Sequence, residues 1–324
     1  MNGMSSLLQR IARLLLLSVM ACGAPVLLHA QQASVPAAPS LSAARGAFVT
    51  KIAMPTADGR PATVAPESIL RTLKYTSPAG ELSAYLTPDP HDGKRHPAII
   101  WITGGDCNSI GDVWRAASSS NDQTAAAYRR AGIVMMFPSL RGGNANPGKR
   151  EAFYGETQDI LAAADFLSTV PYVDPARIHL GGHSTGGTMA LLTAEVTSRF
   201  RAVIAFGPVV SPDIYGEELL PVDFSKLDPR ELQLRRPALW LDSIRSPTLV
   251  LEGVDRGNGE HLKLMKKLNR NPLVTFIAVP GTDHFCVLAP ANALLARKII
   301  DDTGPGTAIS LSAKEIASLS GGSR

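Results

Sequence analysis

The sequence predicts an α/β fold, in which a mostly parallel, twisted sheet carries helices on both faces. Short continuous apolar runs recur along the chain, and such runs are typical of strands that are buried on both faces of a parallel sheet. Segments of helical length separate them, and this alternation is the pattern of α/β domains. The strands are expected at Ala98–Thr103, Ile133–Phe137, Phe200–Phe206, Thr248–Glu252 and Val274–Val279, with another in the apolar stretch that begins at Ile178.

Helices are expected between these strands from the spacing of apolar residues and from stop signals. In the segment 157–170, Ile160, Ala163, Ala164 and Leu167 recur at the interval that places them on one helical face. Gly132 follows the segment 122–131 as a helix stop. The expected helices are Asp122–Ala131, Thr157–Val170, Met189–Val196, Glu260–Leu268 and Ala291–Ile300.

The two ends of the domain differ from this alternating centre. Two runs of alternating polarity, Ile69–Thr76 and Glu81–Thr87, flank the turn Ser77–Gly80 and predict an antiparallel hairpin. Beyond Gly304 the chain is small and polar, apart from a short helical pattern at Ser312–Leu319.

The N-terminus predicts an export signal followed by a flexible leader. Residues 1–13 carry two arginines and no acid, and an apolar run to Leu28 precedes the small residue Ala30. We therefore expect a signal peptide at 1–30 and a periplasmic or secreted protein. A second interpretation remains, because the residues up to Cys22 resemble a bacterial lipobox, which would tether the protein to a membrane through a lipid on that cysteine.

The remaining chain is expected to form one domain. Residues 31–47 are rich in Ala, Pro, Ser and Gln with almost no charge, so they predict a flexible leader. Residues 48–303 are enough for one large α/β domain with a well-buried core, and 304–324 are expected to be a tail. The proline-rich, charged segment 209–246 is irregular and predicts a lid within that domain.

Composition and motifs argue against several classes of ligand. The net charge is +4 and the pI is near 9.0, but the basic residues are spread out, so we expect no nucleic-acid partner. The loop 143–150 comes close to a phosphate-binding P-loop, yet Arg150 stands where a Ser or Thr is needed, so no nucleotide is expected. The seven histidines form no metal-ligand spacing, and we expect neither a metal nor another cofactor.

The pattern G-x-S-x-G at Gly182–Gly186 identifies the candidate nucleophile. An apolar run precedes it and a helix-like run follows it, so Ser184 is expected on a tight turn from strand to helix. The flanking glycines leave room for a strained backbone there. A serine hydroxyl needs a base to become a nucleophile, so the pattern also predicts a histidine and an acid elsewhere in the chain.

The base and the acid are expected after the last two strands. His284 follows the strand at 274–279, and the order Ser, acid, His is that of α/β-hydrolases. Asp255, in the turn after the strand at 248–252, is our choice for the acid, and Glu252 is the alternative. The strand at 98–103 ends in paired glycines, so the amides of Gly105, Asp106 and Thr185 are the expected oxyanion donors.

The segments around Ser184 resemble one particular family of this fold. The runs Pro138–Gly142, Asp159–Ala164, Val173–Ile178 and Gly182–Gly187 are similar to those of the catalytic domain of prolyl-oligopeptidase-like serine hydrolases. The resemblance covers most of residues 70–300 and implies an α/β-hydrolase fold. Thr185 stands where peptidases of that family usually carry tyrosine, and the chain is too short for the β-propeller of many of them.

These features together predict an exported serine hydrolase that works through an acyl-enzyme intermediate. A carboxylesterase-like activity on a small ester is our main expectation, and a prolyl-oligopeptidase-like peptidase is the first alternative. A non-catalytic binding protein with the same fold is the alternative from another class. The sequence leaves the substrate and the oligomeric state open.

Cysteine positions lead to one structural hypothesis. Loss of the leader with Cys22 would leave Cys107 and Cys286 in an oxidising compartment. Cys107 follows the oxyanion loop and Cys286 follows His284, and both loops are expected to converge on Ser184. We therefore hypothesise a disulfide between these two cysteines.

Overall fold

A computed structural model describes residues 40–319 of the chain, with gaps at 57–58 and 308. The expected signal peptide, most of the leader and the lipobox around Cys22 lie outside the described residues. Within the described part, no helix has both the length and the apolar character that a membrane crossing requires.

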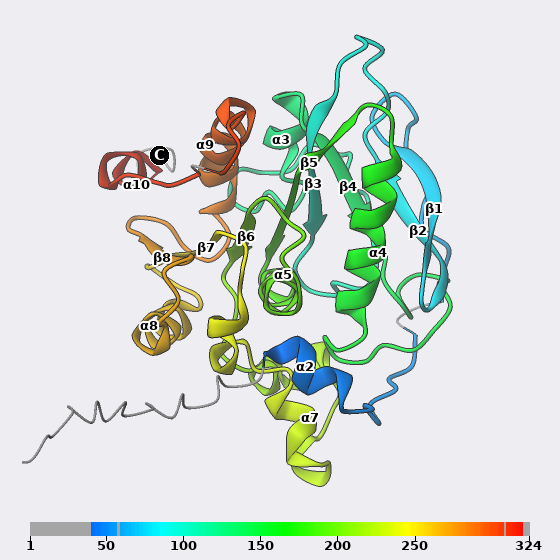
Figure 1. The fold of residues 1–324 in the computed structure, drawn as a ribbon, viewed down its shortest axis with the longest axis vertical. Helices are drawn as coiled ribbons and strands as arrows, with labels where there is room; N and C mark the ends of the chain where they lie inside the picture. The colour runs from blue at the N-terminus through cyan, green and yellow to red at the C-terminus, as the bar shows by residue number, and fades with distance from the viewer. Residues whose placement is uncertain (1–39, 57–58, 308, 320–324) are drawn as a thin grey trace, which may run out of the picture. The chain divides into compact units, whose positions relative to one another are not determined.

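The core is one eight-stranded sheet with strand order β1-β2-β4-β3-β5-β6-β7-β8 (Figure 1). β1 pairs antiparallel with β2 and β2 with β4, whereas all the other neighbours are parallel. The α/β-hydrolase fold class is therefore confirmed, together with the antiparallel opening hairpin. The strands are β1 (Arg71–Ser77), β2 (Gly80–Leu86), β3 (His96–Ile102), β4 (Val134–Pro138), β5 (Val173–His183), β6 (Val203–Phe206), β7 (Thr248–Gly253) and β8 (Val274–Val279).

Helices connect the parallel strands and pack on both faces of the sheet. The main ones are α3 (Ala126–Arg130), α4 (Glu156–Thr169), α5 (Thr185–Val196), α8 (Gly259–Leu268) and α9 (Leu288–Asp301). The segment 209–246 contains only short pieces, which are η1 (Pro212–Tyr215), α6 (Gly216–Leu219), η2 (Phe224–Lys226), α7 (Pro229–Gln233), η3 (Pro237–Leu239) and η4 (Leu241–Ser243). Its prolines start several of these pieces and prevent a long helix.

Alternation along the strands divides the core into two clusters, one on each face. On β3, Ile100 belongs to the cluster that holds α4 and α5, whereas Ile99 and Trp101 belong to the cluster that holds α3 and α9. All three side chains are almost fully buried. Burial of each such side chain contributes about 1.5–3 kcal/mol. Both faces of the sheet are covered, which is why successive residues of its strands are apolar in the sequence.

The domain begins earlier than the sequence predicted. Residues up to 47 were expected to be a flexible leader, but α2 (Leu41–Gly46) is a helix whose first turn is capped by Ser40. Leu41 is fully buried, and the Arg45 guanidinium donates to the carbonyls of Phe153, Tyr154 and Leu234. These hydrogen bonds hold α2 against the domain. The acceptors lie far away in the sequence, so the composition of the segment could not predict them.

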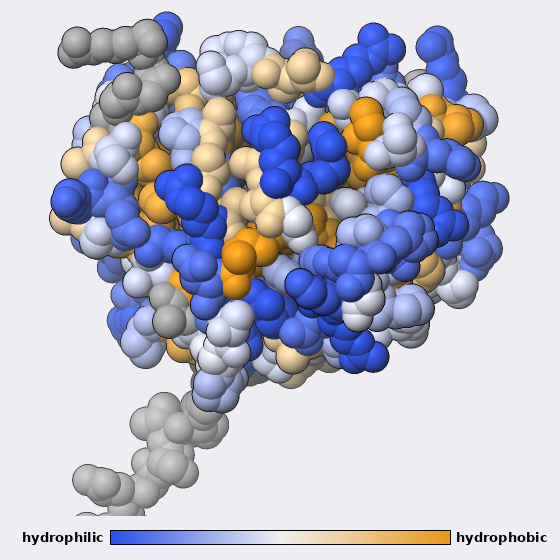
Figure 2. Space-filling view, turned by 90° about the horizontal axis from the view of Figure 1, so that it is seen from above, coloured by the Kyte–Doolittle hydropathy of each residue, from blue (hydrophilic) through white to orange (hydrophobic). Residues whose placement is uncertain are grey.

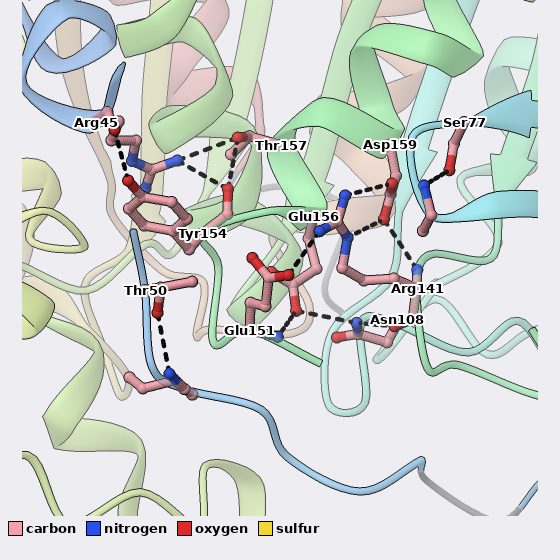
Figure 3. Close-up of polar contacts among 12 residues, drawn as sticks. Arg45, Thr50, Ser77, Asn108, Arg141, Glu151, Tyr154, Glu156, Thr157 and Asp159 are labelled. Carbon is pink, nitrogen blue, oxygen red and sulfur yellow. Dashed lines mark hydrogen bonds and ion pairs between the residues drawn. The ribbon is translucent and has the colours of Figure 1, made fainter. Parts of the chain in front are cut away.

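Arg45 belongs to a polar network that reaches the loop before α4 (Figure 3). Its Nη1 also donates to Thr157 Oγ1 at 3.1 Å, and its guanidinium lies 4.7 Å from the ring centre of Tyr154. The Tyr154 hydroxyl donates back to the carbonyl of Arg45. The start of the domain is thus tied to residues 153–157, which follow the loop that lines the candidate site.

The C-terminal tail also packs against the domain. The expected short helix is present as α10 (Ala313–Leu319), and Ile309 and Leu319 are buried in the same cluster as α9. Lys298 of α9 makes a 2.8 Å ion pair with Glu315 of α10. On the face seen in Figure 2, hydrophobic side chains lie in small separate groups among hydrophilic ones, as on an ordinary solvent-facing surface.

Candidate active site

Ser184 lies on a sharp turn between β5 and α5. Its backbone has φ 56° and ψ −115°, a conformation that costs energy in a residue with a side chain and persists only where the surroundings enforce it. The Ser184 amide donates to the carbonyl of Phe206 at 2.8 Å, which holds the turn against β6. The strand, turn and helix predicted around the G-x-S-x-G pattern are all present.

The two glycines of the pattern are required by space. A Cβ atom at position 182 would lie 2.4 Å from the carbonyl oxygen of Gly186, and one at position 186 would lie 2.2 Å from that of Ile102. Any side chain at either position would push the helix away from the sheet. The turn can therefore be this tight only with glycine on both sides of the serine.

His284 is paired with Glu252. The Nδ1 atom of His284 lies 2.9 Å from Oε2 of Glu252, whose side chain is only 1% exposed, whereas that of His284 is 13% exposed. Glu252 is in β7, and His284 is in the loop between β8 and α9. A carboxylate in this position fixes the imidazole tautomer with its proton on Nδ1, so Nε2 is left as the basic nitrogen.

The prediction that Asp255 is the partner of His284 is wrong in this structure, and the alternative, Glu252, takes the place. Asp255 is exposed in the turn after β7, where its amide donates to the carbonyl of Thr282 at 3.0 Å. Glu252 is still within the strand, but its side chain is one methylene longer than that of aspartate. It therefore reaches the imidazole from the sheet, without help from the turn.

Two further glycines make room for this pair. A Cβ atom at Gly207 would lie 2.4 Å from Cε1 of His284 and 2.5 Å from Oε2 of Glu252. A Cβ atom at Gly257 would lie 2.7 Å from Cβ of His284 and 2.9 Å from Oε1 of Glu252. Both glycines have positive φ, so space and backbone conformation together require glycine there. Nothing in the sequence alone pointed to them.

The expected oxyanion donors lie together beside Ser184. The Thr185 hydroxyl donates to the carbonyl of Gly105 at 2.8 Å, so the first turn of α5 is joined to the loop after β3. In the described part of the chain, the amides of Gly105 and Asp106 have no hydrogen-bond acceptor, and Thr185 is the first residue of its helix, where amides lack an intrahelical partner. Their place beside Ser184 is compatible with an oxyanion hole, and that role remains a prediction.

Two residues that the sequence did not single out as functional lie between these parts. Gln123, in the loop before α3, accepts from the Gly104 amide and donates to His183. His183 precedes the serine and is buried, with its ring centre 4.5 Å from that of His284. Burial and the neighbouring His284 lower the pKa of His183 to about 3, so its ring is neutral.

A narrow hollow adjoins two of the candidate oxyanion donors, Gly105 and Thr185. Residues of the expected lid, Tyr215, Leu219 and Leu220, form one part of its wall, and Tyr215 is joined to α5 by a 2.6 Å hydrogen bond with Thr188. Its other lining residues are Met54, Gly105, Cys107, Asn108, Arg150, Ala152, Phe153 and Thr185. The segment 209–246 thus forms part of the wall of this hollow, and its role as a lid remains a prediction.

Arg150 is the one cation that lines this hollow. Its guanidinium lies 3.7 Å from Asp106 of the oxyanion loop, and its buried Nε has no acceptor among the described residues. The loop that carries it is held at its start by Arg141, which binds Asp159 through two nitrogens and Glu151 through a third (Figure 3). Arg150, the last residue of the near P-loop, therefore forms part of the wall of the hollow.

The hypothesised disulfide between Cys107 and Cys286 is absent, so that prediction is wrong. Cys107 is buried among core residues beneath the oxyanion loop, and burial raises the pKa of its thiol to about 12. Cys286 Sγ instead accepts the amide of Asp283 at 3.1 Å, close to its own loop. Cys107 thus packs in the core, whereas Cys286 makes its hydrogen bond within its own loop.

The described residues contain no cluster of three or more His, Cys, Asp or Glu side chains suited to hold a metal ion. The expectation that the protein uses no metal is untested by this observation. What the geometry does bring together is a strained serine, a histidine with a carboxylate on Nδ1, and backbone amides beside the serine. This set is suited to acyl transfer.

Known proteins with similar sequences and folds place the chain in a family. It is 25% identical over 194 residues to the uncharacterized peptidase YtmA of Bacillus subtilis, which covers 57% of this chain and 72% of that protein. It is 30% identical over 153 residues to S-formylglutathione hydrolase of Mus musculus, or 40% of this chain and 52% of that one.

Solved structures agree on the fold. Puromycin hydrolase superposes with a TM-score of 0.58 at 20% identity, and the match covers 74% of this chain but only 40% of that protein. Residues 119–292, just over half of the 324, match the sequence model described as Prolyl oligopeptidase family. The resemblance seen in the sequence is thus confirmed, and the chain belongs to the prolyl oligopeptidase family of serine hydrolases.

Proposed function

We propose that this protein is a serine peptidase that cleaves an amide bond in small peptides or aminoacyl amides through an acyl-enzyme on Ser184. The observation that carries the proposal is the 2.9 Å contact between His284 and Glu252, near the strained turn of Ser184, whose neighbour His183 has its ring centre 4.5 Å from that of His284. A carboxylate on Nδ1 orients the imidazole so that its Nε2 can act as a general base for serine. A binding protein would not need this arrangement.

In the proposed reaction, Ser184 Oγ attacks the substrate carbonyl while His284 Nε2 takes its proton. The negative charge on the carbonyl oxygen is stabilised by amide donors, for which Gly105, Asp106 and Thr185 are the candidates. The imidazolium that forms is stabilised by Glu252, and it then gives the proton to the leaving amine. Water repeats the sequence on the acyl-enzyme and releases the second product.

The comparisons change our preference between the two enzymatic alternatives. The sequence favoured a carboxylesterase-like activity, but the family and the relatives named as peptidases favour the peptidase alternative. Both reactions use one mechanism, so catalytic residues alone could not separate them.

Arg150 adds support for a peptide substrate. A peptide offers a second carbonyl oxygen next to the bond that is cleaved, and a simple alkyl ester does not. The guanidinium of Arg150 lines the hollow by the oxyanion loop and has donors to offer there. We propose that it holds such an oxygen, so Arg150→Met should raise KM for dipeptidyl anilides, which carry a second carbonyl, more than for nitrophenyl esters.

Ester hydrolysis is the second candidate function, because S-formylglutathione hydrolase is among the relatives at 30% identity. A panel of aminoacyl p-nitroanilides and p-nitrophenyl esters, run with the wild type and Ser184→Ala, separates the two. The peptidase proposal expects serine-dependent turnover of anilides. Serine-dependent turnover of esters alone would favour the esterase, and failure of a fluorophosphonate probe to label folded wild type would favour a binding protein.

We further propose that the protein is exported, as its first 30 residues suggest. Support comes from the composition of that segment alone. N-terminal sequencing of the mature protein tests it. Cleavage near Ala30 is the expected result, cleavage before Cys22 with lipid on that cysteine would indicate a tethered lipoprotein, and an intact Met1 would contradict export.

A further inference from the structure

A chain of three hydrogen bonds joins the oxyanion loop to the loop of His284. The Gly104 amide lies 3.0 Å from Oε1 of Gln123, and Nε2 of Gln123 lies 2.7 Å from Nδ1 of His183. Nε2 of His183 in turn lies 2.9 Å from the carbonyl oxygen of His284. Three separate segments around the candidate nucleophile therefore meet through two side chains.

The direction of every bond in this chain follows from its two ends. The carbonyl of His284 can only accept, so His183 must carry its proton on Nε2. A neutral imidazole then accepts at Nδ1, so Gln123 must present its NH₂ group there and its oxygen to the Gly104 amide. That amide can only donate, and the chain is consistent from end to end.

Only glutamine satisfies both neighbours at position 123. Its side chain offers one acceptor and one donor group on the same planar unit, and both are used. Its backbone carbonyl accepts from Trp101 Nε1 at 3.0 Å, which anchors the residue to β3. The remaining proton of Nε2 goes to Asn121 Oδ1 at 2.9 Å, within the same loop.

We propose that Gln123 is a positioning residue for the reaction, which acts through His183 to hold the His284 loop and through Gly104 to hold the oxyanion loop. The inference rests on the proposed function of Ser184 and His284. The hydrogen bonds of the Gln123 side chain go to Gly104, Asn121 and His183 and not to the side chains of Ser184 or His284, so it contributes order to the catalytic parts and no chemistry. Displacements as small as 1 Å cost about a hundredfold in rate at such sites.

The decisive variant is Gln123→Met, which is similar in length but can neither donate nor accept these bonds. We expect kcat on a nitrophenyl ester or aminoacyl anilide to fall by about tenfold to a hundredfold. KM should change by less than about threefold, because Gln123 orients catalytic groups rather than substrate. The rate of fluorophosphonate labelling of Ser184 should fall in parallel with kcat.

Asn121→Ala is the matched control, because it removes one hydrogen bond of Gln123 and leaves the chain to His183 and Gly104 intact. We expect its kcat and KM to stay within about twofold of wild type. An equal loss in both variants would mean that the loop is merely structural and would overturn the proposal. So would a Gln123→Met enzyme with wild-type kcat.

Gln123→Glu gives a second readout, which a purely structural role would not move. The carboxylate still accepts from Gly104, but it has no proton for His183 Nδ1. His183 must then take up a second proton to keep its bond to His284, and it loses that proton as the pH rises. The titratable groups that face its ring are His284 and the new carboxylate, with Glu252 behind His284.

We therefore expect the kcat of Gln123→Glu, relative to wild type, to fall as the pH rises, whereas that of Gln123→Met stays in constant ratio. A flat ratio for Gln123→Glu would overturn the proposal. Ser184→Ala, tested in parallel, separates this inference from the proposed function. If Ser184→Ala is inactive while Gln123→Met matches wild type, only the role of Gln123 fails, and activity in Ser184→Ala would remove the proposed function itself.

Discussion

Oε2 of Glu252 lies 2.9 Å from Nδ1 of His284, and Oε1 of the same carboxylate is buried without a hydrogen-bond partner among the described residues. The carboxylate therefore depends on His284 as its partner, and the imidazole depends on the carboxylate for its orientation. This mutual dependence leads to the first prediction.

Glu252→Gln should lower kcat on the order of a thousandfold or more, because the amide presents a donor as well as an acceptor and no longer enforces one imidazole tautomer. Asp255→Asn should change kcat by less than about threefold, since Asp255 is an exposed turn residue. Steady-state kinetics on one chromogenic substrate compares them. The opposite ranking would restore Asp255 as the acid.

Ser184→Ala and His284→Ala should each remove nearly all turnover, and the double variant should lose little more. Members of one proton-transfer unit fail together, so their effects are far from additive. Circular dichroism and thermal melting serve as the control for folding. Independent, additive losses in the double variant would show that the two residues do not act as a unit.

The sequence predicted the sheet and its helices closely, because these elements depend on local patterns. The run Val274–Val279 was expected as a strand, and β8 has the same bounds. Ser184 and His284 were also found from local signals, namely the glycine-flanked pattern and a histidine after the last strand. Periodicity and turn chemistry carry this information within a few residues.

The failures all concern contacts between distant residues. We preferred Asp255 to Glu252 because the turn after a strand is the usual place for the acid. The sequence does not show how far the loop of His284 lies from each of the two side chains. Arg45 lies in a proline-containing stretch that has almost no other charge, so its composition predicts no core, yet the acceptors of Arg45 lie more than a hundred residues away. Gln123 has no motif at all, since its role arises only where three loops meet.

Arg45→Met should lower the free energy of unfolding by about 2–4 kcal/mol, because it leaves several buried carbonyls without donors. Arg95→Met, at an exposed position, is the matched control and should change stability by less than about 0.5 kcal/mol. Urea denaturation measures both. Equal, small effects would mean that α2 is not part of the cooperative fold.

Truncation tests the same boundary in a second way. A chain that begins at residue 40 keeps α2, and one that begins at residue 48 lacks it. The longer chain should match the mature protein in stability, and the shorter one should be destabilised at least as much as Arg45→Met. Stability that is equal in both chains would restore residue 48 as the start of the domain.

Unfolded, unreduced protein that lacks the leader should react with Ellman's reagent at both Cys107 and Cys286, because the structure contains no disulfide between them. In the folded state Cys107 should be nearly inert, since burial raises its pKa to about 12 and thiolate is the reactive form. Absence of reaction in the unfolded protein would show that the two cysteines are oxidised to a disulfide.

His179 gives a prediction for pH. It is fully buried in β5 with no hydrogen-bond partner on either ring nitrogen among the described residues, and burial lowers its pKa to about 3. In the unfolded chain the value is near 6.5. Below that pH the unfolded state takes up a proton that the folded state refuses, so stability is lost as the pH falls from 6.5 toward 3.

His179→Leu removes this titration and keeps an apolar side chain of similar size in the core. Each pH unit below 6.5 is worth about 1.4 kcal/mol, so the stability of the variant relative to wild type should rise by about 2 kcal/mol between about pH 7 and about pH 5. Other titrating groups, His183 included, cancel in this difference. Urea denaturation at the two pH values measures it, and a difference for His179→Leu that does not change with pH would mean that the folded protein takes up a proton on this ring as readily as the unfolded chain does.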